Sequence, residues 1–194
     1  MHYEVVTYGD PVLRKKAEPV TVFDASLRRL AADMVRTMHE ARGVGLAAEQ
    51  VGRTLALCVI DVPPEADVDT EGGPRLNPAV AMPLIMANPR ITTRAGEMEG
   101  EEGCLSFPAI YGPVKRPYEV TAEYQDLDGI DRRITARGLL SRAIQHELDH
   151  LRGVLLIDHF SAARKLSLGL SLKRLKKETL KRQEEAAAGG AGPG

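Results

Sequence analysis

The stretch Ile144-Gln145-His146-Glu147-Leu148-Asp149-His150 decides the interpretation of this chain, because it contains the pattern His-Glu-x-x-His. Residues four apart on a helix lie on one face about one turn apart. The imidazoles of His146 and His150 can therefore reach the same cation. Glu147 lies beside them, where it can accept a proton from a water at the metal. Two ligands do not hold a catalytic metal, so the chain must supply a third.

Cys104 is the candidate for the third ligand. It lies in a segment, residues 96–108, whose four glutamates and three glycines argue against an ordinary core strand. A thiolate with two imidazoles is a known ligand set for a catalytic site that leaves one coordination position open. The same residues predict that Glu102 is oriented by Arg116 and that this pair braces the Cys104 loop.

Two rival interpretations use other residues. A His-Glu-x-x-His metallopeptidase would take its third ligand from downstream, where Asp158 and His159 lie. A closed structural zinc site would instead take Cys58 as its fourth ligand and would need no Glu147. The metallopeptidase would leave the Cys104 segment and the amide side chain of Gln50 unexplained.

Length and composition favour one domain with a tail. The chain has 194 residues, a formal net charge of −1 and two cysteines, Cys58 and Cys104. These numbers predict no disulfide framework, no general attraction to nucleic acid, and no sequence-specific nucleic-acid binding. Neither a secretory signal nor an apolar run of 18 residues is apparent, so we expect no membrane contact and a cytoplasmic location.

Hydrophobic periodicity predicts a small set of elements before the metal helix. We expect an amphipathic helix over 25–42 that ends at Gly43, buried strands over 55–62 and 81–87, a turn at Asn88-Pro89, and a β-hairpin over 113–134. Thr135 is the expected N-cap of a buried metal helix over about 136–152. The catalytic domain is predicted to span residues 1–160.

The C-terminal part is strongly basic. A helix is expected over 161–185, and residues 164–182 carry eight Lys and Arg against one Glu, a local net charge of +7. Such a helix is either a solvated surface helix or a contact for an anionic partner such as RNA phosphates. Residues 186–194 consist of small residues and are expected to be a disordered tail.

Three segments together resemble one known family. The segments Gly43–Gln50, Glu102–Ser106 and His146–His150 occur in the order and with the residues of peptide deformylase, which removes the N-formyl group from new polypeptides. The resemblance extends over about residues 3–160. It implies an α+β fold in which mixed and antiparallel sheets surround a central metal-binding helix. It also implies N-formylated nascent peptides as substrates, and the basic segment 164–182 is a possible ribosome contact.

The resemblance assigns roles residue by residue. It implies one divalent metal ion per chain, natively Fe²⁺, with Zn²⁺, Ni²⁺ or Co²⁺ able to replace it. By this resemblance, the metal ligands are Cys104, His146 and His150, and Glu147 is the general base and then the general acid. The oxyanion donors are Gln50 and the backbone N–H of Leu105. The backbone at Val44, Gly45 and Gly103 binds the substrate. Leu139 and Ala143 are candidate walls of the methionine pocket. Tyr111 stands where some family members carry a peptide-contacting Arg, which leaves selectivity beyond formylmethionine open.

Overall fold

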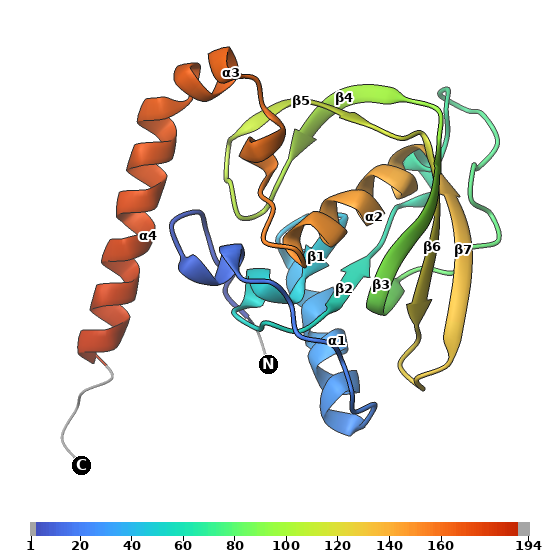
Figure 1. Cartoon of the computed structure of the whole chain (residues 1–194), viewed down its shortest axis with the longest axis horizontal. Helices are drawn as coiled ribbons and strands as arrows, with labels where there is room; N and C mark the ends of the chain where they lie inside the picture. Colours follow the sequence, from blue (N-terminus) through green and yellow to red (C-terminus); the bar gives the residue numbers. More distant parts are fainter. Residues whose placement is uncertain (1–2, 190–194) are drawn as a thin grey trace.

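The computed structural model describes residues 3–189, and α2 (Gly138–His150), the helix with His-Glu-x-x-His, is its central element. Figure 1 shows α2 in the middle of the fold, with a two-stranded ribbon on one side and a larger sheet on the other. Helices and antiparallel sheets thus surround the predicted metal helix. This confirms the α+β fold class.

The larger sheet has five strands in the order β1-β2-β3-β6-β7, and every neighbouring pair is antiparallel. The strands are β1 (Gly45–Ala47), β2 (Leu57–Ile60), β3 (Leu84–Ala95), β6 (Glu119–Gln125) and β7 (Asp131–Arg137). The short strand β1 forms one edge, so its outer side is free to pair with another extended chain. Within residues 3–189, the pairing that is parallel is a single bridge between Glu18 and Leu55.

The β6–β7 hairpin confirms that a hairpin turns at Asp126–Gly129, although it covers residues 119–137 rather than the expected 113–134. Asp126 Oδ1 accepts hydrogen bonds from the backbone N–H groups of Asp128 (2.9 Å) and Ile130 (3.0 Å). Gly129 has φ +76°, a left-handed conformation that a residue without a Cβ adopts at little cost. The Asp and Gly residues of the turn therefore form it by the chemistry that the sequence predicted.

The ribbon consists of β4 (Met98–Gly103) and β5 (Tyr111–Arg116), paired from Met98–Arg116 to Gly103–Tyr111. Successive side chains on a strand point to opposite faces. On β4 this alternation leaves Glu99, Glu101 and Gly103 exposed and buries Glu102. The ribbon thereby points the Glu102 carboxylate inward and places Cys104, which directly follows β4, next to the interior.

Apolar packing fixes α1 (Ala25–Glu40) and α2 on the sheet. α1 buries Leu27, Ala31, Met34 and Met38, which confirms the Met pair as core. α2 buries Leu140, Ile144 and Leu148 in a second core cluster with β2 and β6. Asp24 caps α1 as expected, because its carboxylate accepts hydrogen bonds from the N–H groups of Ser26 and Leu27.

Most expected boundaries are shifted by a few residues, and three expectations are wrong for a local reason. β7 continues through Thr135 to Arg137, so α2 begins at Gly138 and Thr135 is no N-cap. The left-handed residue after α1 is Arg42 (φ +56°) rather than Gly43. Asn88 does not end a strand, since β3 runs through it with a register shift. Asn88 Oδ1 instead accepts a hydrogen bond from the Val20 N–H, and Asn88 Nδ2 donates one to Val20 O, at 2.8 Å each.

The C-terminal region forms two helices, α3 (Ala162–Ser167) and α4 (Gly169–Gly189), where one was expected. Residues 186–189 are helical, which contradicts that part of the predicted disordered tail; the rest, 190–194, lies outside the described residues. α4 packs along the N-terminal segment (Figure 1). Leu175 joins a cluster with Leu13 and Phe107, and Arg182 Nη2 donates to Thr7 Oγ1 at 2.7 Å. No helix within residues 3–189 is both long and apolar enough to cross a membrane.

Glu49 is an unusual member of the interior. Its side chain is fully buried in the 3-10 helix Ala48–Val51, and neither carboxylate oxygen has a hydrogen-bond partner among residues 3–189. Burial raises the pKa of Glu49 to about 8, and the charge of Glu147 adds to the effect. An acid whose pKa is higher in the folded state makes folding less favourable as the pH rises between the unfolded and folded pKa values.

We expect Glu49→Gln to remove a pH-dependent loss of stability. Between pH 5 and pH 8 the free energy of unfolding of the wild type should fall relative to that of Glu49→Gln by roughly 3 kcal/mol, since the unfolded carboxyl ionises near pH 4.5 and the folded one near pH 8. Urea unfolding at both pH values measures this difference. Glu65→Gln, at an exposed position, is the control; equal pH dependence in the wild type and Glu49→Gln would contradict the burial of an unpaired acid.

Candidate metal centre

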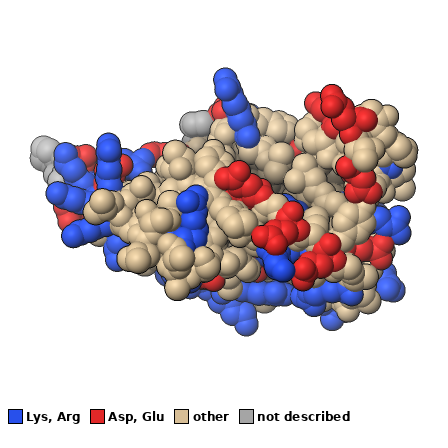
Figure 2. Space-filling model, turned by 90° about the horizontal axis from the view of Figure 1, so that it is seen from above, with Lys and Arg blue, Asp and Glu red and all other residues tan. Residues whose placement is uncertain are grey.

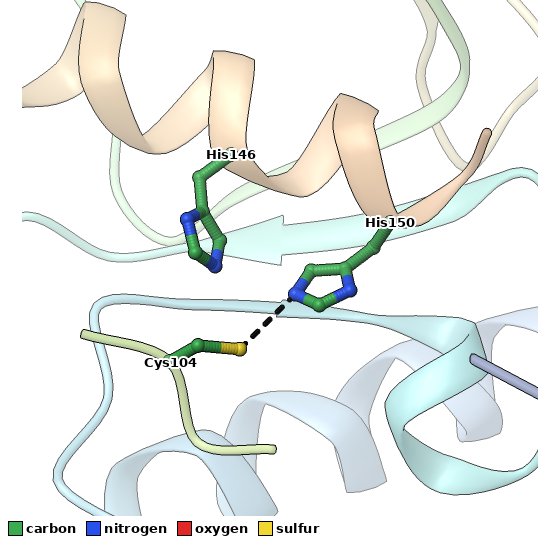
Figure 3. Close-up of side chains that lie close together, drawn as sticks. All are labelled: Cys104, His146 and His150. Carbon is green, nitrogen blue, oxygen red and sulfur yellow. Dashed lines mark hydrogen bonds between the residues drawn. The ribbon is translucent and has the colours of Figure 1, made fainter. Parts of the chain in front are cut away.

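Three side chains from two elements converge at the centre of the fold. α2 presents His146 and His150 on one face, with ring centroids 5.0 Å apart and ring planes at 70°. Cys104, after β4, approaches from the opposite side (Figure 3). Its Sγ lies 3.2 Å from His150 Nε2, and one ligand atom from each residue lies within 4.8 Å of the others. The structure therefore brings together the three ligands predicted from sequence.

The chemistry of this donor set fits a divalent metal. His146 Nδ1 faces Glu102 Oε2 at 3.1 Å, which leaves Nε2 of that ring for the ion. One thiolate and two imidazoles fill three positions and leave a fourth open, as catalytic rather than structural sites do. Among residues 3–189, the cluster comprises Cys104, His146 and His150.

The residues that the rival interpretations need lie elsewhere. Cys58 is fully buried in β2, where it faces Met86 across the sheet. Asp158 pairs with Arg14, and His159 Nε2 lies 2.8 Å from Asp149 Oδ2. Since neither Cys58 nor the downstream pair joins the cluster, the described chain offers no fourth protein ligand for a closed site and no downstream third ligand.

Electrostatics favours the ligand form of Cys104. Burial alone would raise the pKa of this thiol, but the neighbouring His150 and His146 outweigh burial and lower the pKa to about 5. The thiolate is the species that binds metal. The site is thus prepared to present a deprotonated sulfur at neutral pH.

Glu102 connects the ribbon to the metal helix. Arg116 Nε and Nη2 contact its two carboxylate oxygens at 3.0 Å each, which is the pair predicted from sequence. Arg142 Nη1 on α2 donates to Oε1 at 2.7 Å. Burial would raise the pKa of Glu102, yet the hydrogen bonds with His146 and Arg116 hold it far below its usual range. Glu102 therefore stays ionised inside the protein and orients His146.

Sequence reasoning missed Arg142, Asp149 and Ser106. Arg142 precedes His146 by four residues on α2, so its helical spacing could have placed it on the ligand face. Asp149 Oδ2 accepts from Arg116 Nη1 at 2.6 Å and extends the network to His159. Ser106 ends the segment Glu102–Ser106, but nothing in its spacing indicated the contact that it makes with Gln50.

Glu147 lies beside the cluster in a tight space. Its side chain is 3% exposed, and Oε2 has no hydrogen-bond partner among residues 3–189. Burial raises the pKa of Glu147 to about 7, although His146 and His150 lower it in part. A Cβ at Gly45 would lie 2.2 Å from Glu147 Oε1, so only glycine allows the β1 backbone to approach this carboxylate.

Gln50 is held with its amide nitrogen toward the cluster. Its Oε1 accepts a hydrogen bond from the Ala47 N–H at 2.8 Å. Its Nε2 donates to Ser106 Oγ at 3.2 Å and lies 3.5 Å from Cys104 Sγ. The orientation of this side chain is therefore fixed before any substrate arrives.

A cavity of about 680 Å³ opens onto these groups, a size that suits a bound small ligand. Every predicted catalytic and substrate-binding residue lies on its wall, as do Leu139 and Ala143. The predicted residues on this wall are Val44, Gly45, Gln50, Gly103, Leu105 and Glu147. Arg116 lies behind Glu102, where it supports the wall without forming it.

A helix-borne His-Glu-x-x-His pair, a third ligand, an open position and a carboxylate beside it define the class of mononuclear metal-dependent hydrolases. Comparison with known proteins narrows this class. A family model described as polypeptide deformylase matches residues 2–166. The chain belongs to the polypeptide deformylase family.

Relatives and solved structures agree over nearly the whole chain. A peptide deformylase of Opitutus terrae is 45% identical over 184 residues, covering 92% of this chain and 95% of that protein. One from Nitrosococcus oceani is 41% identical, covering 94% and 97%. The crystal structure of peptide deformylase from Thermus thermophilus superposes with a TM-score of 0.78 at 40% identity, covering 91% and 99%.

We expect Glu102→Gln to weaken metal binding by about 10–100-fold, because His146 loses the carboxylate that orients its ring. Competition with a chelator at a temperature where both proteins are folded measures this affinity. Asp61→Asn is a matched control, since Asp61 contacts His39 Nε2 at 2.8 Å in a His–carboxylate pair outside the site. Unchanged affinity in Glu102→Gln would contradict the orienting role.

Proposed function

We propose that this chain hydrolyses the N-formyl group from the N-terminal formylmethionine of newly made polypeptides and releases formate. The observation that carries this proposal is the Cys104–His146–His150 cluster, with Glu147 and Gln50 beside it at one cavity. Membership of the polypeptide deformylase family supports it. Because such substrates are made in the cytoplasm, the proposal includes a cytoplasmic location.

Cys104, His146 and His150 would hold one divalent ion, and we propose Fe²⁺ as the native one. A thiolate with two imidazoles also suits Zn²⁺, Ni²⁺ or Co²⁺. When bound, such an ion polarises a carbonyl oxygen and lowers the pKa of coordinated water to about 7. The remaining steps depend on side chains and backbone of this chain.

Glu147 is the proposed general base and then general acid. Water adds to the formyl carbon and gives its proton to Glu147. The C–N bond then breaks, and Glu147 returns the proton to the departing amine, so that formate and a free amino terminus result. Its pKa, raised by burial to about 7, suits both directions of transfer at neutral pH.

Gln50 and Leu105 are the proposed oxyanion donors. As water adds, negative charge develops on the formyl oxygen, and fixed donors stabilise it without reorganisation. The Gln50 amide is already oriented, because its Oε1 accepts from the Ala47 N–H and its Nε2 donates to Ser106 Oγ. The backbone N–H of Leu105 follows the ligand Cys104 on the cavity wall.

The backbone at Val44, Gly45 and Gly103 would bind the peptide as an added strand. β1 is an edge strand, and β4 pairs on one side with β5. An extended peptide between β1 and β4 could therefore bond to both. Leu139 and Ala143, one helical turn apart on α2, would form part of the pocket for the methionine side chain.

We expect Glu147→Gln to retain the metal and to lose about 10²–10⁴-fold in kcat for a formyl-methionyl peptide, because proton transfer is removed. Metal analysis and formate release on the same sample test this. Glu49→Gln is the control, since Glu49 is buried but does not line the cavity, and this variant should deformylate at the wild-type rate. Full activity in Glu147→Gln would refute the proton-transfer role.

We also propose that the basic helices approach the ribosome. Figure 2 shows Lys and Arg side chains gathered at the end of the molecule where α4 lies. Their local charge of +7 suits RNA phosphates. Leu166 and Leu170, 85% and 86% exposed at the α3–α4 junction, add an uncovered apolar pair to this surface.

Charge reversal on the exposed side of α4 should reduce co-sedimentation with ribosomes. The variant is Lys173→Glu, Lys177→Glu and Lys181→Glu, whose side chains do not form the contact of α4 with residues 3–14. At low salt, this variant should bind ribosomes more weakly than the wild type does, since its binding releases fewer counterions from the RNA. Reversal of Lys15, Lys16 and Arg53 on the body is the control. Equal co-sedimentation of the two triple variants and the wild type would contradict this surface.

A further inference from the structure

Two charged side chains on the cavity wall are not used by the proposed reaction. Five charged residues line the cavity: Arg42, Glu101, Glu102, Arg142 and Glu147. Glu102 and Arg142 contact each other, and Glu147 is the proposed base. The other two, Arg42 and Glu101, are exposed and have no side-chain hydrogen bond or ion pair with any residue of the described chain. Both charges are thus free to contact a ligand.

Each charge lies close to backbone that would bind the peptide. Arg42 precedes Val44 by two residues, at the junction of α1 and β1. Glu101 precedes Gly103 by two residues on β4 and shares its exposed face, because side chains alternate along a strand. On β4, Glu101 lies about 7 Å from Gly103, which is the length of two residues of an extended peptide. Arg42 lies in the turn before β1, on the wall of the same cavity.

The backbone at Arg42 is strained in a way that fixes its position. Its φ of +56° is left-handed, which disfavours a residue with a Cβ. The turn is held by hydrogen bonds from Arg42 N–H to His39 O and from Gly43 N–H to Met38 O, both 2.9 Å. Strained residues of this kind concentrate at ligand-binding positions. The turn projects Arg42 beside the cavity even though glycine would relax it.

Glu101 belongs to the more acidic side of the cavity. Figure 2 shows acidic side chains gathered on the face formed by the β4–β5 ribbon. Glu97 lies 3.3 Å and Glu99 3.9 Å from Lys115 Nζ, whereas Glu101 has no such partner in the described chain. The ring of Tyr111 lies against Gly103, since a Cβ at Gly103 would lie 2.5 Å from this ring.

We propose that Arg42 and Glu101 are specificity-determining residues that sense the charge of the third residue of the substrate, an inference that rests on the proposed deformylation. Arg42 favours an acidic side chain at that position, and Glu101 favours a basic one. Neither residue contacts the formyl group, so both act on peptide binding and hence on KM. The preferred substrates are peptides whose third side chain is charged.

The test compares three peptides, formyl-Met-Ala-Glu, formyl-Met-Ala-Lys and formyl-Met-Ala-Gln, each amidated at its carboxyl end. Arg42→Gln should lower kcat/KM for the Glu peptide about two- to fivefold, through KM, and leave the Gln peptide unchanged. Glu101→Gln should do the same for the Lys peptide. Both effects should shrink in roughly 1 M salt, where exposed charges are screened.

Two further variants separate charge from structure. Arg42→Lys keeps the charge and should retain the wild-type ratio of Glu to Lys peptide. Arg53→Gln, at an exposed arginine away from the cavity wall, should change no ratio. Equal effects of Arg42→Gln on all three peptides, or no effect on any, would overturn the inference. If the metal-loaded wild type deformylates none of the peptides, the proposed function fails instead.

Discussion

The ion-pair network of Glu102 is the interaction on which the site depends. This buried carboxylate accepts hydrogen bonds from Arg116 on β5 and from Arg142 on α2, and it faces His146 on α2. Removing one partner of such a buried network would leave an uncompensated charge. The network therefore holds β4, β5 and α2 in fixed positions relative to one another. Because Cys104 follows Glu102 by two residues, the same network sets the distance between the thiolate and the two imidazoles.

A second constraint is the closeness of the β1 backbone to Glu147. No side chain fits at Gly45, and the adjacent Gln50 is fixed by Ala47 and Ser106. The proposed base, oxyanion donor and peptide-binding strand are therefore held together by one short segment, Gly43–Gln50, packed against α2. Such preorganisation is what makes fixed donors effective when charge develops during a reaction.

The sequence predicted which residues lie together at the cavity better than it predicted the element boundaries. His146 and His150 follow from helical spacing, and Cys104 follows from a segment that an ordinary core strand does not explain. Arg116 follows from the need to pair Glu102, whereas Gln50 came from the family resemblance. Arg142 was missed because an arginine side chain usually faces water. The predictions of an N-cap at Thr135 and of a turn at Asn88 were wrong, because strand pairing in β7 and β3 outweighed the local cap and turn preferences. The burial of Glu49 had no sequence signal.

The central claim is that deformylation requires one metal ion held by Cys104, His146 and His150. The most direct test is to titrate Fe²⁺ into metal-free protein without oxygen and to measure bound iron and formate release on the same sample. The account predicts that formate release rises in proportion to bound iron and saturates at one ion per chain. Formate release at the full rate by metal-free protein would contradict it.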